Sequence, residues 1–179
     1  PLNGTPSSHI LKPAIHAVED SVINEGFCMA LAEAMQLKPA KSKVHAVLDR
    51  PFLLVERYDR VVDAPGHRQR LHQEDFCQAL GVGPDQKYEQ HGGPGMQKCL
   101  QLLQGSAARD DTTLFLLTQL AFTLMAATDG HAKNFSIHLD RGDAYRMTPL
   151  YDVLSMWPYF GDGANQFRQR NAGLAMAVR

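Results

Sequence analysis

Three side chains with oxygen ligands and a defined spacing stand out in the last third of the sequence. Asp129 and Asn134 are separated by four residues, and Asp152 follows after a segment with the pattern of a β-hairpin. A carboxylate can orient a hydroxyl group and accept its proton. Magnesium prefers hard oxygen ligands and keeps several waters, so one Asn and one Asp could hold it together with phosphate oxygens. These residue types therefore suit phosphoryl transfer to a hydroxyl group.

The same stretch also has a purely structural interpretation. Asp129-Gly130 and Lys133-Asn134 are typical turn residues between a helix and a strand, and Gly130 permits backbone angles that other residues avoid. For Asp-Gly alone the turn interpretation is preferable. The whole arrangement, with an apolar helix before it and Phe-Ser-Ile-His-Leu after it, favours the functional interpretation. Asp-x4-Asn with a later Asp is the spacing by which protein kinases place a catalytic carboxylate and two magnesium ligands.

At this point the sequence resembles the C-terminal kinase domain of HipA, the serine/threonine kinase toxin of bacterial toxin–antitoxin pairs. The resemblance rests on Thr-Asp-Gly-His-Ala-Lys-Asn-Phe-Ser and on Tyr-Arg-Met-Thr-Pro-Leu-Tyr-Asp-Val-Leu-Ser. Further stretches match upstream, in order, at 9–13, 24–25, 55–60, 73–78, 87–89 and 92–95. It implies an α+β, protein-kinase-like fold with two lobes. Residues 1–58 would form the remainder of the ATP-binding small lobe with the hinge, and residues 59–179 the helical catalytic lobe, incomplete at its C-terminus.

The resemblance gives each candidate residue a role with ATP and Mg²⁺. Asp129 would be the catalytic carboxylate, and Asn134 and Asp152 would hold magnesium while contacting the nucleotide. Lys12 would bind phosphate, as the lysine on the third strand does in protein kinases. The other cofactor-binding candidates are Glu56, Arg57 and Tyr58 at the hinge, His131 and Lys133 in the catalytic turn, and Tyr151.

Several upstream residues have alternative interpretations. An isolated Lys12 would be an edge-strand lysine in water, and the family context reverses that default. Glu25 lies early in an expected helix, where it either pairs with Lys12 or is favoured by the helix dipole; the sequence leaves both open. Asp59 and Arg60 are expected to belong to a solvated charge cluster at a strand end.

Hydrophobic patterning predicts the elements that must position these residues. A helix over 20–37, capped by Asp20 or Ser21, precedes two antiparallel strands, of which the second should be an interior strand covered on both faces. The helix over 110–127 is apolar almost all round, so it should be buried and hold the catalytic turn rigidly. The other expected elements are a strand at 9–11, strands at 44–48 and 52–58, a loop or hairpin at 61–71 with its tip at 63–66, helices at 73–80 and 96–103, a loop at 81–95, and a hairpin of 135–139 with 144–147.

Bulk properties exclude several classes of protein. A net charge of −1 over 179 residues gives no electrostatic reason to expect direct binding to nucleic acid or to acidic membranes. The sequence has no apolar run long enough to cross a membrane and no signal-peptide pattern at its start. Cys28, Cys77 and Cys99 are widely spaced, so we expect buried free thiols in a reducing cytoplasm. The histidines lack zinc-ligand spacing.

The sequence also departs from the protein-kinase pattern. No His-Arg precedes Asp129 and no Phe-Gly follows Asp152, as expected for HipA-like kinases. No glycine-rich phosphate loop precedes His9, so we expect a fragment that lacks this loop and the C-terminal helical region. The resemblance implies a protein substrate such as an aminoacyl-tRNA synthetase, a HipB-like antitoxin partner, and DNA contact only through that antitoxin. The alternatives are a non-catalytic module that binds antitoxin or nucleotide without turnover, and a small-molecule kinase of related fold.

Overall fold

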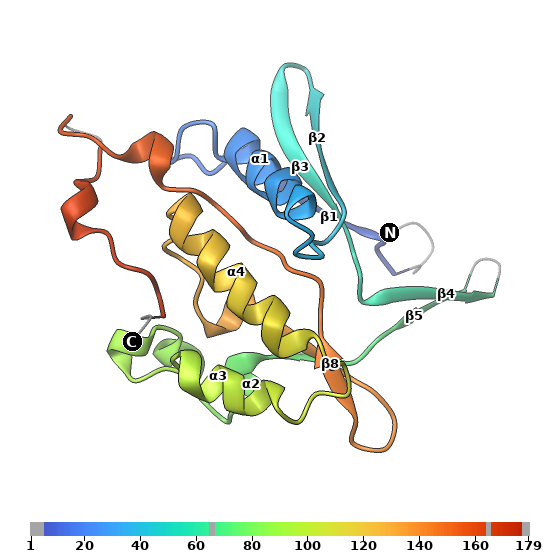
Figure 1. Ribbon diagram of the computed structural model, residues 1–179. Helices are drawn as coiled ribbons and strands as arrows, with labels where there is room; N and C mark the ends of the chain where they lie inside the picture. The colour runs from blue at the N-terminus through green and yellow to red at the C-terminus, as the bar shows by residue number, and fades with distance from the viewer. Residues whose placement is uncertain (1–5, 65–66, 164–165, 177–179) are drawn as a thin grey trace.

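The computed structural model describes residues 6–64, 67–163 and 166–176 and has an α+β fold. A three-stranded antiparallel sheet in the order β1-β3-β2 lies beside helix α1 in the upper part of Figure 1. A second sheet, in the order β6 (Gln73–Asp75), β7 (Ser136–Leu139) and β8 (Tyr145–Met147), lies with helices α2 (Phe76–Ala79), α3 (Met96–Leu103) and α4 (Asp111–Met125) in the lower part. The elements of the first part are β1 (His9–Pro13), α1 (Ser21–Ala34), β2 (Ser42–Val47) and β3 (Arg50–Glu56).

Strand β3 is central in its sheet, as expected, but it is buried on one face only. Leu53 and Val55 are 0% and 7% exposed, whereas Phe52 and Leu54 between them are half-buried. The prediction that both faces are covered was therefore wrong, because α1 packs on one face and no layer of the described residues covers the other. Gly26 makes this approach possible: a Cβ there would come within 2.5 Å of Val44 Cγ2.

Helix α1 is shorter than expected and begins without a side-chain cap. Asp20 has a left-handed backbone (φ 51°) and its side chain makes no capping hydrogen bond. The hydroxyl oxygen of Ser21 instead accepts the N–H of Ile15 at 2.8 Å, which ties down the preceding loop. The helix ends at Ala34, before the positive φ of Gln36.

The segment after β3 corrects one predicted helix. β4 (Arg60–Ala64) and β5 (His67–Arg70) form the expected antiparallel hairpin, and 65–66 of its expected tip lie outside the described residues. Residues 73–80 are not all helical: β6 (Gln73–Asp75) pairs with β7, and α2 spans only Phe76–Ala79. The helix starts late because Asp75 caps it, accepting the N–H of Gln78 at 2.9 Å.

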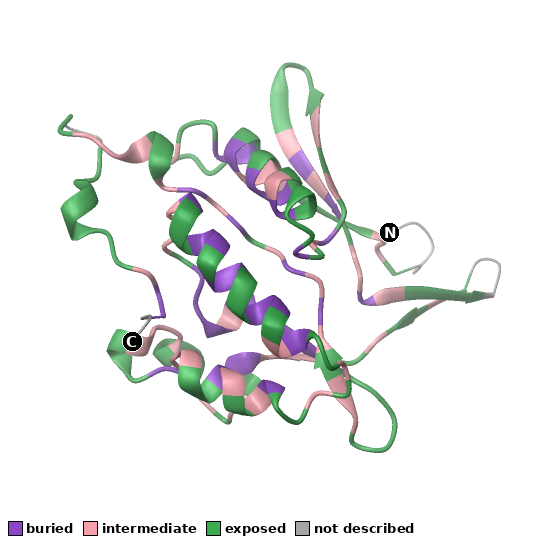
Figure 2. Cartoon of the chain, viewed as in Figure 1, coloured by how far each residue is buried: buried purple, intermediate pink, exposed green. Residues whose placement is uncertain are grey.

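The two longer helices of the lower part follow their predicted ranges, with one difference in burial. α3 spans Met96–Leu103 and α4 spans Asp111–Met125. α4 is not buried all round: Phe115 and Phe122 face the core at 0% and 2% exposure. Its opposite face carries exposed apolar residues, as the green turns of α4 in Figure 2 show: Leu116, Leu117, Leu120 and Leu124. Hydrophobic composition alone could not distinguish these two faces.

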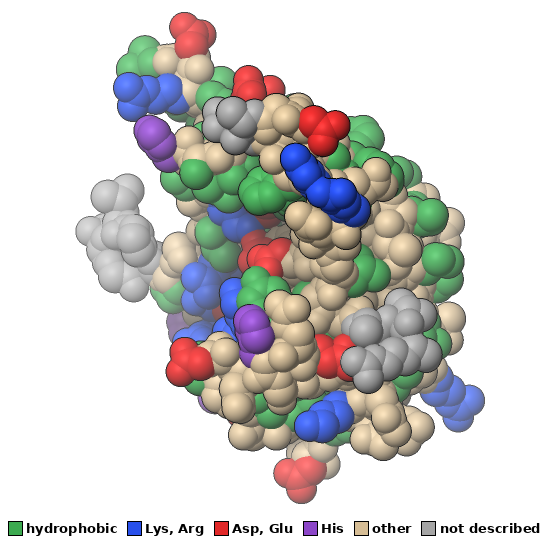
Figure 3. Space-filling model, turned by 90° about the vertical axis from the view of Figure 1, so that its left-hand side faces the viewer, with side chains coloured by type: hydrophobic (Ala, Val, Ile, Leu, Met, Phe, Trp, Pro, Cys, Tyr) green, Lys and Arg blue, Asp and Glu red, His purple; other side chains and the backbone are tan. Residues whose placement is uncertain are grey.

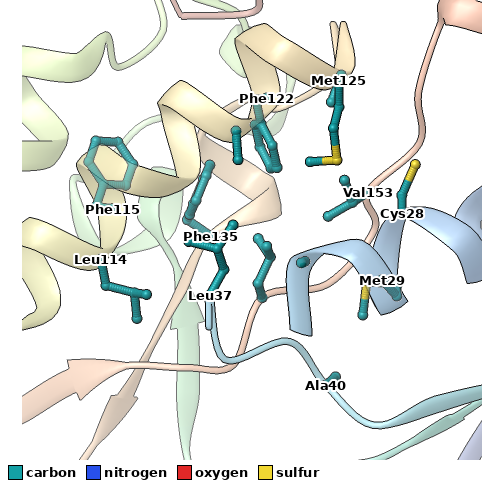
Figure 4. Packing of buried hydrophobic residues seen from close by; sticks show 14 of the residues in the cluster. Cys28, Met29, Leu37, Ala40, Leu114, Phe115, Phe122, Met125, Phe135 and Val153 are labelled. Atoms are coloured by element: carbon teal, nitrogen blue, oxygen red, sulfur yellow. The ribbon is translucent and has the colours of Figure 1, made fainter. Parts of the chain in front are cut away.

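One hydrophobic cluster connects the two parts of the molecule. It extends from α1 and β3 to α3, α4 and the strands β7 (Ser136–Leu139) and β8 (Tyr145–Met147). Figure 4 shows Met125 at the end of α4 lying close to Val153 and to Cys28 of α1. The three cysteines are buried and free, as expected. Within the described residues, no helix is long and apolar enough to cross a membrane.

Candidate active site

The turn after α4 is built around the backbone carbonyl of Asp129. This oxygen accepts the side-chain N–H of Asn134 and the backbone N–H of His131, each at 2.8 Å. Asn134 closes the short 3-10 helix η4 (Ala132–Asn134) and is buried. Because its Nδ2 atom is used within the turn, its Oδ1 atom is the group that remains for a metal ion.

Gly130 has a different role from the expected one. Its φ does not lie in the left-handed region, so its backbone freedom is not needed there. A Cβ at this position would instead overlap the ring of Phe122 on α4. The glycine therefore lets the turn lie directly against the buried helix that precedes it.

The Asp129 carboxylate is 64% exposed and meets two side chains through one of its oxygens. The Tyr88 hydroxyl donates to Oδ1, and His131 Nε2 lies 3.7 Å from the same atom. The contact with Asp129 raises the pKa of Tyr88 to about 12, so this phenol remains a donor at neutral pH. Burial lowers the pKa of His131, against an opposing effect of Asp129, so the imidazole is favoured in its neutral form.

Lys12 brings together two carboxylates from distant parts of the chain. Its Nζ donates to Glu25 Oε1 at 2.6 Å and also to Asp152 Oδ1. Lys12 is on an edge strand, but these two partners show that it is not simply a lysine in water. Glu25 lies outside the first turn of α1, so the ion pair with Lys12, and not the helix dipole, accounts for its position.

Asp152 is held in place by its neighbours in the chain. Its backbone is left-handed (φ 56°), and Leu150 and Val153 on either side are buried in the core. Three residues after Asp152, Ser155 is bound to Asn24 on α1 through its backbone. The Ser155 carbonyl accepts from Asn24 Nδ2 at 2.8 Å, and the Ser155 N–H donates to Asn24 Oδ1 at 3.0 Å. Asn24 was not among the predicted site residues. A polar residue on the buried face of α1, next to Glu25, was the sequence signal that could have found it.

Several predicted nucleotide-binding residues line one cavity of about 230 Å³ between the two sheets. The rings of Tyr58 and Tyr151 stack on its wall with centroids 6.0 Å apart. This volume is below the usual range for ligand pockets, so it suits the base of a nucleotide rather than a whole one. The lining also includes Lys12, Glu25, Glu56, Arg57, Gln73 and Asp152.

The hinge backbone offers one unpaired donor in the described part of the chain. The N–H of Glu56 donates to Lys41 O at 2.8 Å, and that of Arg57 to Ser8 O at 2.9 Å. Tyr58 N–H makes no such bond among the described residues. It is therefore the hinge group that could donate to the edge of a base.

The charged cluster beside the hinge differs from its expected setting. Asp59 is 4% exposed and accepts two hydrogen bonds from Arg57, at 3.0 and 2.9 Å, as well as one from Arg60. The expectation of a solvated cluster for Asp59 and Arg60 was wrong, because the three side chains form a largely buried network beside the hinge. In the catalytic turn, Lys133 Nζ pairs with Asp75 Oδ2 at 2.6 Å.

Asp129 lies on a second, larger cavity of about 690 Å³. Its wall includes Tyr88, Thr128, Phe160 and residues 166–168 and 171–175. On the smaller cavity, the Tyr151 hydroxyl is tied to the catalytic turn: it donates to Lys133 O at 3.1 Å and contacts Ser136 Oγ at 2.6 Å. Figure 3 shows a face that is hollowed near its centre, where acidic and basic side chains lie together.

The side-chain types of Asn134 and Asp152, each with an oxygen ligand, suit a magnesium–nucleotide complex. Within the described ranges, no three His, Cys, Asp or Glu side chains converge on a metal position. An Asn–Asp pair supplies only part of a coordination shell, which suits magnesium bound mainly by phosphate oxygens and water. Lys12 lies directly beside Asp152, so its charge can meet the same phosphates.

Comparison with known proteins assigns the chain to a family. The family model for the HipA-like C-terminal domain matches residues 2–179. The chain belongs to the HipA-like C-terminal domain family. The Sinorhizobium fredii protein named Putative kinase Y4mE is 47% identical over 161 residues, which cover 89% of this chain and 38% of that protein. A second protein of that organism, Putative kinase Y4dM, is 31% identical over 107 residues, covering 60% of this chain and 24% of its own length.

Solved structures confirm the kinase-like fold. HipA in the Shewanella oneidensis complex of HipA, HipB and operator DNA matches with a TM-score of 0.80 and 28% identity, over 96% of this chain and 41% of that one. The Helicobacter pylori proinflammatory kinase CtkA matches with a TM-score of 0.61 and 12% identity, over 84% of this chain and 52% of that one. The chain thus spans well under two thirds of the length of each of these four proteins, and the two solved structures share its kinase-like α+β fold.

Proposed function

We propose that this chain carries the phosphoryl-transfer site of an ATP- and magnesium-dependent serine/threonine protein kinase of the HipA type. The observation that carries the proposal is the meeting of Lys12 with both Glu25 and Asp152 at the base-sized cavity. This contact reproduces the relation between strand lysine, helix glutamate and metal-binding aspartate in protein kinases. Residues 1–58 would act as the nucleotide-binding part and residues 59–179 as the catalytic part.

Each side chain then has a role set by its position. Magnesium and ATP, when bound, supply the transferable phosphate and neutralise its charge. Tyr58 and Tyr151 hold the base, and Glu56 and Arg57 shape the hinge beside it. Lys12 steadies the phosphates, while Asp152 and the Asn134 Oδ1 atom provide the protein's metal ligands.

On the other side of the turn, the Asp129 carboxylate orients the attacking hydroxyl and takes its proton. Its exposure on the larger cavity leaves room for a segment of a protein substrate. Neutral His131 beside it adds no charge that would compete for the carboxylate. The ion pair of Lys133 with Asp75 ties the turn to the residue that caps α2.

The proposal extends to partners by family membership. The Shewanella oneidensis structure is a complex of HipA with HipB and operator DNA. We therefore assign to this protein a HipB-like antitoxin, DNA contact through that antitoxin, a cytoplasmic location, and a protein substrate of the class of aminoacyl-tRNA synthetases.

Two measurements on the full-length protein test this function. Calorimetry should detect ATP binding that requires magnesium, and incubation with ATP radiolabelled at the γ-phosphate should label serine or threonine in proteins of a bacterial extract. Binding without transfer would support a non-catalytic module in place of a kinase. The absence of both binding and transfer would refute the assignment of the site.

A further inference from the structure

The loop before α3 carries a tyrosine into the catalytic turn. Tyr88 lies between the 3-10 helices η2 (Pro84–Gln86) and η3 (Glu89–His91), about forty residues upstream of Asp129 in the sequence. Its hydroxyl donates to Asp129 Oδ1, and both residues line the larger cavity. No sequence pattern links the two residues, and only the fold brings them together.

The hydrogen bond occupies one oxygen of the carboxylate and leaves the other available. Oδ1 receives the Tyr88 hydroxyl and lies near His131, whereas Oδ2 has no hydrogen-bond partner among the described residues. A free aspartate on an exposed turn can rotate about its side-chain bonds. A donor fixed to one oxygen limits this rotation, so that the other oxygen points in a defined direction.

The ring of Tyr88 is itself held from several sides. It makes edge contacts with His131 and His91, with centroids 5.0 and 5.8 Å apart. Lys87 Nζ lies 5.0 Å from the ring centroid on its face. The aromatic body is therefore fixed by contacts that do not involve its hydroxyl group.

The backbone of the loop gives Tyr88 a rigid support. The Tyr88 carbonyl accepts the N–H groups of His91 and Gly93, each at 3.0 Å. A Cβ at Gly93 would overlap the carbonyl oxygen of Gln86 and come within 2.8 Å of that of Tyr88. The next residue, Pro94, is fully buried. The glycine-rich stretch 92–95, which has no phosphate-loop spacing, thus has a structural purpose in folding the chain tightly behind Tyr88.

We propose that Tyr88 is a positioning residue that orients the Asp129 carboxylate toward the incoming hydroxyl, and that the tightly folded loop 84–95 holds Tyr88 in place. The proposal rests on the proposed function of Asp129. A tyrosine whose ring contacts His91, His131 and Lys87 is suited to holding a partner rather than to swinging aside as a gate. Removal of its hydroxyl should slow the transfer step and leave nucleotide binding unchanged.

The test compares two tyrosine-to-phenylalanine variants of the full-length protein. Tyr88→Phe keeps the ring contacts and removes the donor. Tyr145→Phe is the matched control, because the Tyr145 hydroxyl donates to Leu102 O at 2.6 Å in the same part of the molecule, away from Asp129. The readout is the steady-state release of ADP from magnesium–ATP, with water as the phosphate acceptor, together with calorimetric binding of magnesium–ATP.

For Tyr88→Phe we expect kcat to fall about 10- to 100-fold, since general-base assistance contributes about 10²- to 10⁴-fold and depends on geometry. KM and Kd for magnesium–ATP should stay within about twofold of wild type, and Tyr145→Phe should turn over normally. 4-Aminophenylalanine at position 88 retains a donor at the same place, so it should recover most of the lost rate. A purely structural role would not predict this recovery.

The outcomes separate this inference from the proposed function. If wild type turns over, Asp129→Asn does not, and Tyr88→Phe matches wild type, then Tyr88 does not position Asp129 and the function stands. A rise in kcat for Tyr88→Phe would also overturn the proposal, because it would make Tyr88 an inhibitory contact. If wild type and Asp129→Asn release ADP equally, the proposed function falls, and the positioning role falls with it.

Discussion

At the residue scale, Asp129 and Asp152 carry different parts of the proposed reaction. Asp129 is exposed and lies on the larger cavity, whereas Asp152 contacts Lys12 at the base-sized cavity. Removal of one carboxylate should therefore affect transfer and magnesium–ATP binding differently from removal of the other. This separation makes the site testable one residue at a time.

Asp129→Ala should greatly slow phosphoryl transfer and leave the fold and magnesium–ATP binding intact. The side chain is 64% exposed and packs little, so the free energy of unfolding should change by less than about 1 kcal/mol. Loss of the proton acceptor should reduce transfer by about 10²-fold or more. Labelled-phosphate transfer, calorimetric ATP binding and urea unfolding check the three parts. Transfer at the wild-type rate would show that Asp129 is not the catalytic carboxylate.

Asp152→Ala should weaken magnesium–ATP binding as well as transfer. The change removes one of the two proposed metal ligands and leaves Lys12 with Glu25 as its partner. Calorimetry with and without magnesium should show that the magnesium-dependent part of the affinity is lost. Asp140→Ala is the control, since Asp140 pairs with Arg146 at 3.1 Å on an exposed hairpin and should bind normally. Equal binding by both variants would contradict the metal-ligand role.

At the element scale, the loop 84–95 shows how a glycine can be needed for space rather than for backbone angle. Gly93 has no positive φ, yet any side chain there would meet backbone atoms of residues 86–88. At Gly83, ten residues earlier, an added Cβ would have no atom within 4 Å, and φ is an ordinary −64°. The two glycines lie in the same segment and differ only in their surroundings.

Gly93→Ala should destabilise the protein by about 1–3 kcal/mol, because backbone must move to admit the methyl group. Gly83→Ala should change stability by less than about 0.5 kcal/mol. Urea unfolding monitored by circular dichroism measures both. Because Gly93 supports Tyr88, the folded Gly93→Ala variant should also turn over more slowly than Gly83→Ala. Equal stability of the two variants would show that the loop is not tightly packed.

At the scale of the whole molecule, stability should depend on pH through its buried histidines. His138 on β7 is 3% exposed, its Nδ1 has no partner among the described residues, and burial lowers its pKa. The unfolded chain therefore takes up a proton at this site near pH 6.5, before the folded protein does. Above about pH 6.5 this histidine does not reduce the free energy of unfolding. Below that pH the free energy of unfolding should fall by up to about 1.4 kcal/mol per pH unit because of this group.

His138→Gln should flatten this pH dependence whatever its effect on stability at pH 7. The slope of the unfolding free energy between pH 7 and pH 5 is the quantity to compare, from urea titrations. His131, also buried with a lowered pKa, should keep part of the slope. An unchanged slope in His138→Gln would show that the folded protein protonates this site readily.

The sequence by itself determined most of the elements and the choice of most candidate residues, because these follow from local pattern. The ranges of α3, of the hairpin β7-β8 and of the antiparallel pair β2-β3 follow from periodicity and turn residues within a few positions. The Asp129-x4-Asn134 turn is likewise local, and its internal hydrogen bonds form between residues five apart or fewer.

Only the tertiary structure decided which distant groups meet. The ion pairs of Lys12 with Glu25 and Asp152 and the contact of Tyr88 with Asp129 join residues from 13 to 140 positions apart. Burial of one face of β3 and exposure of one face of α4 depend in the same way on which layers pack against them. Periodicity reports what a residue's neighbours in the chain favour, whereas these contacts depend on the path of the whole chain.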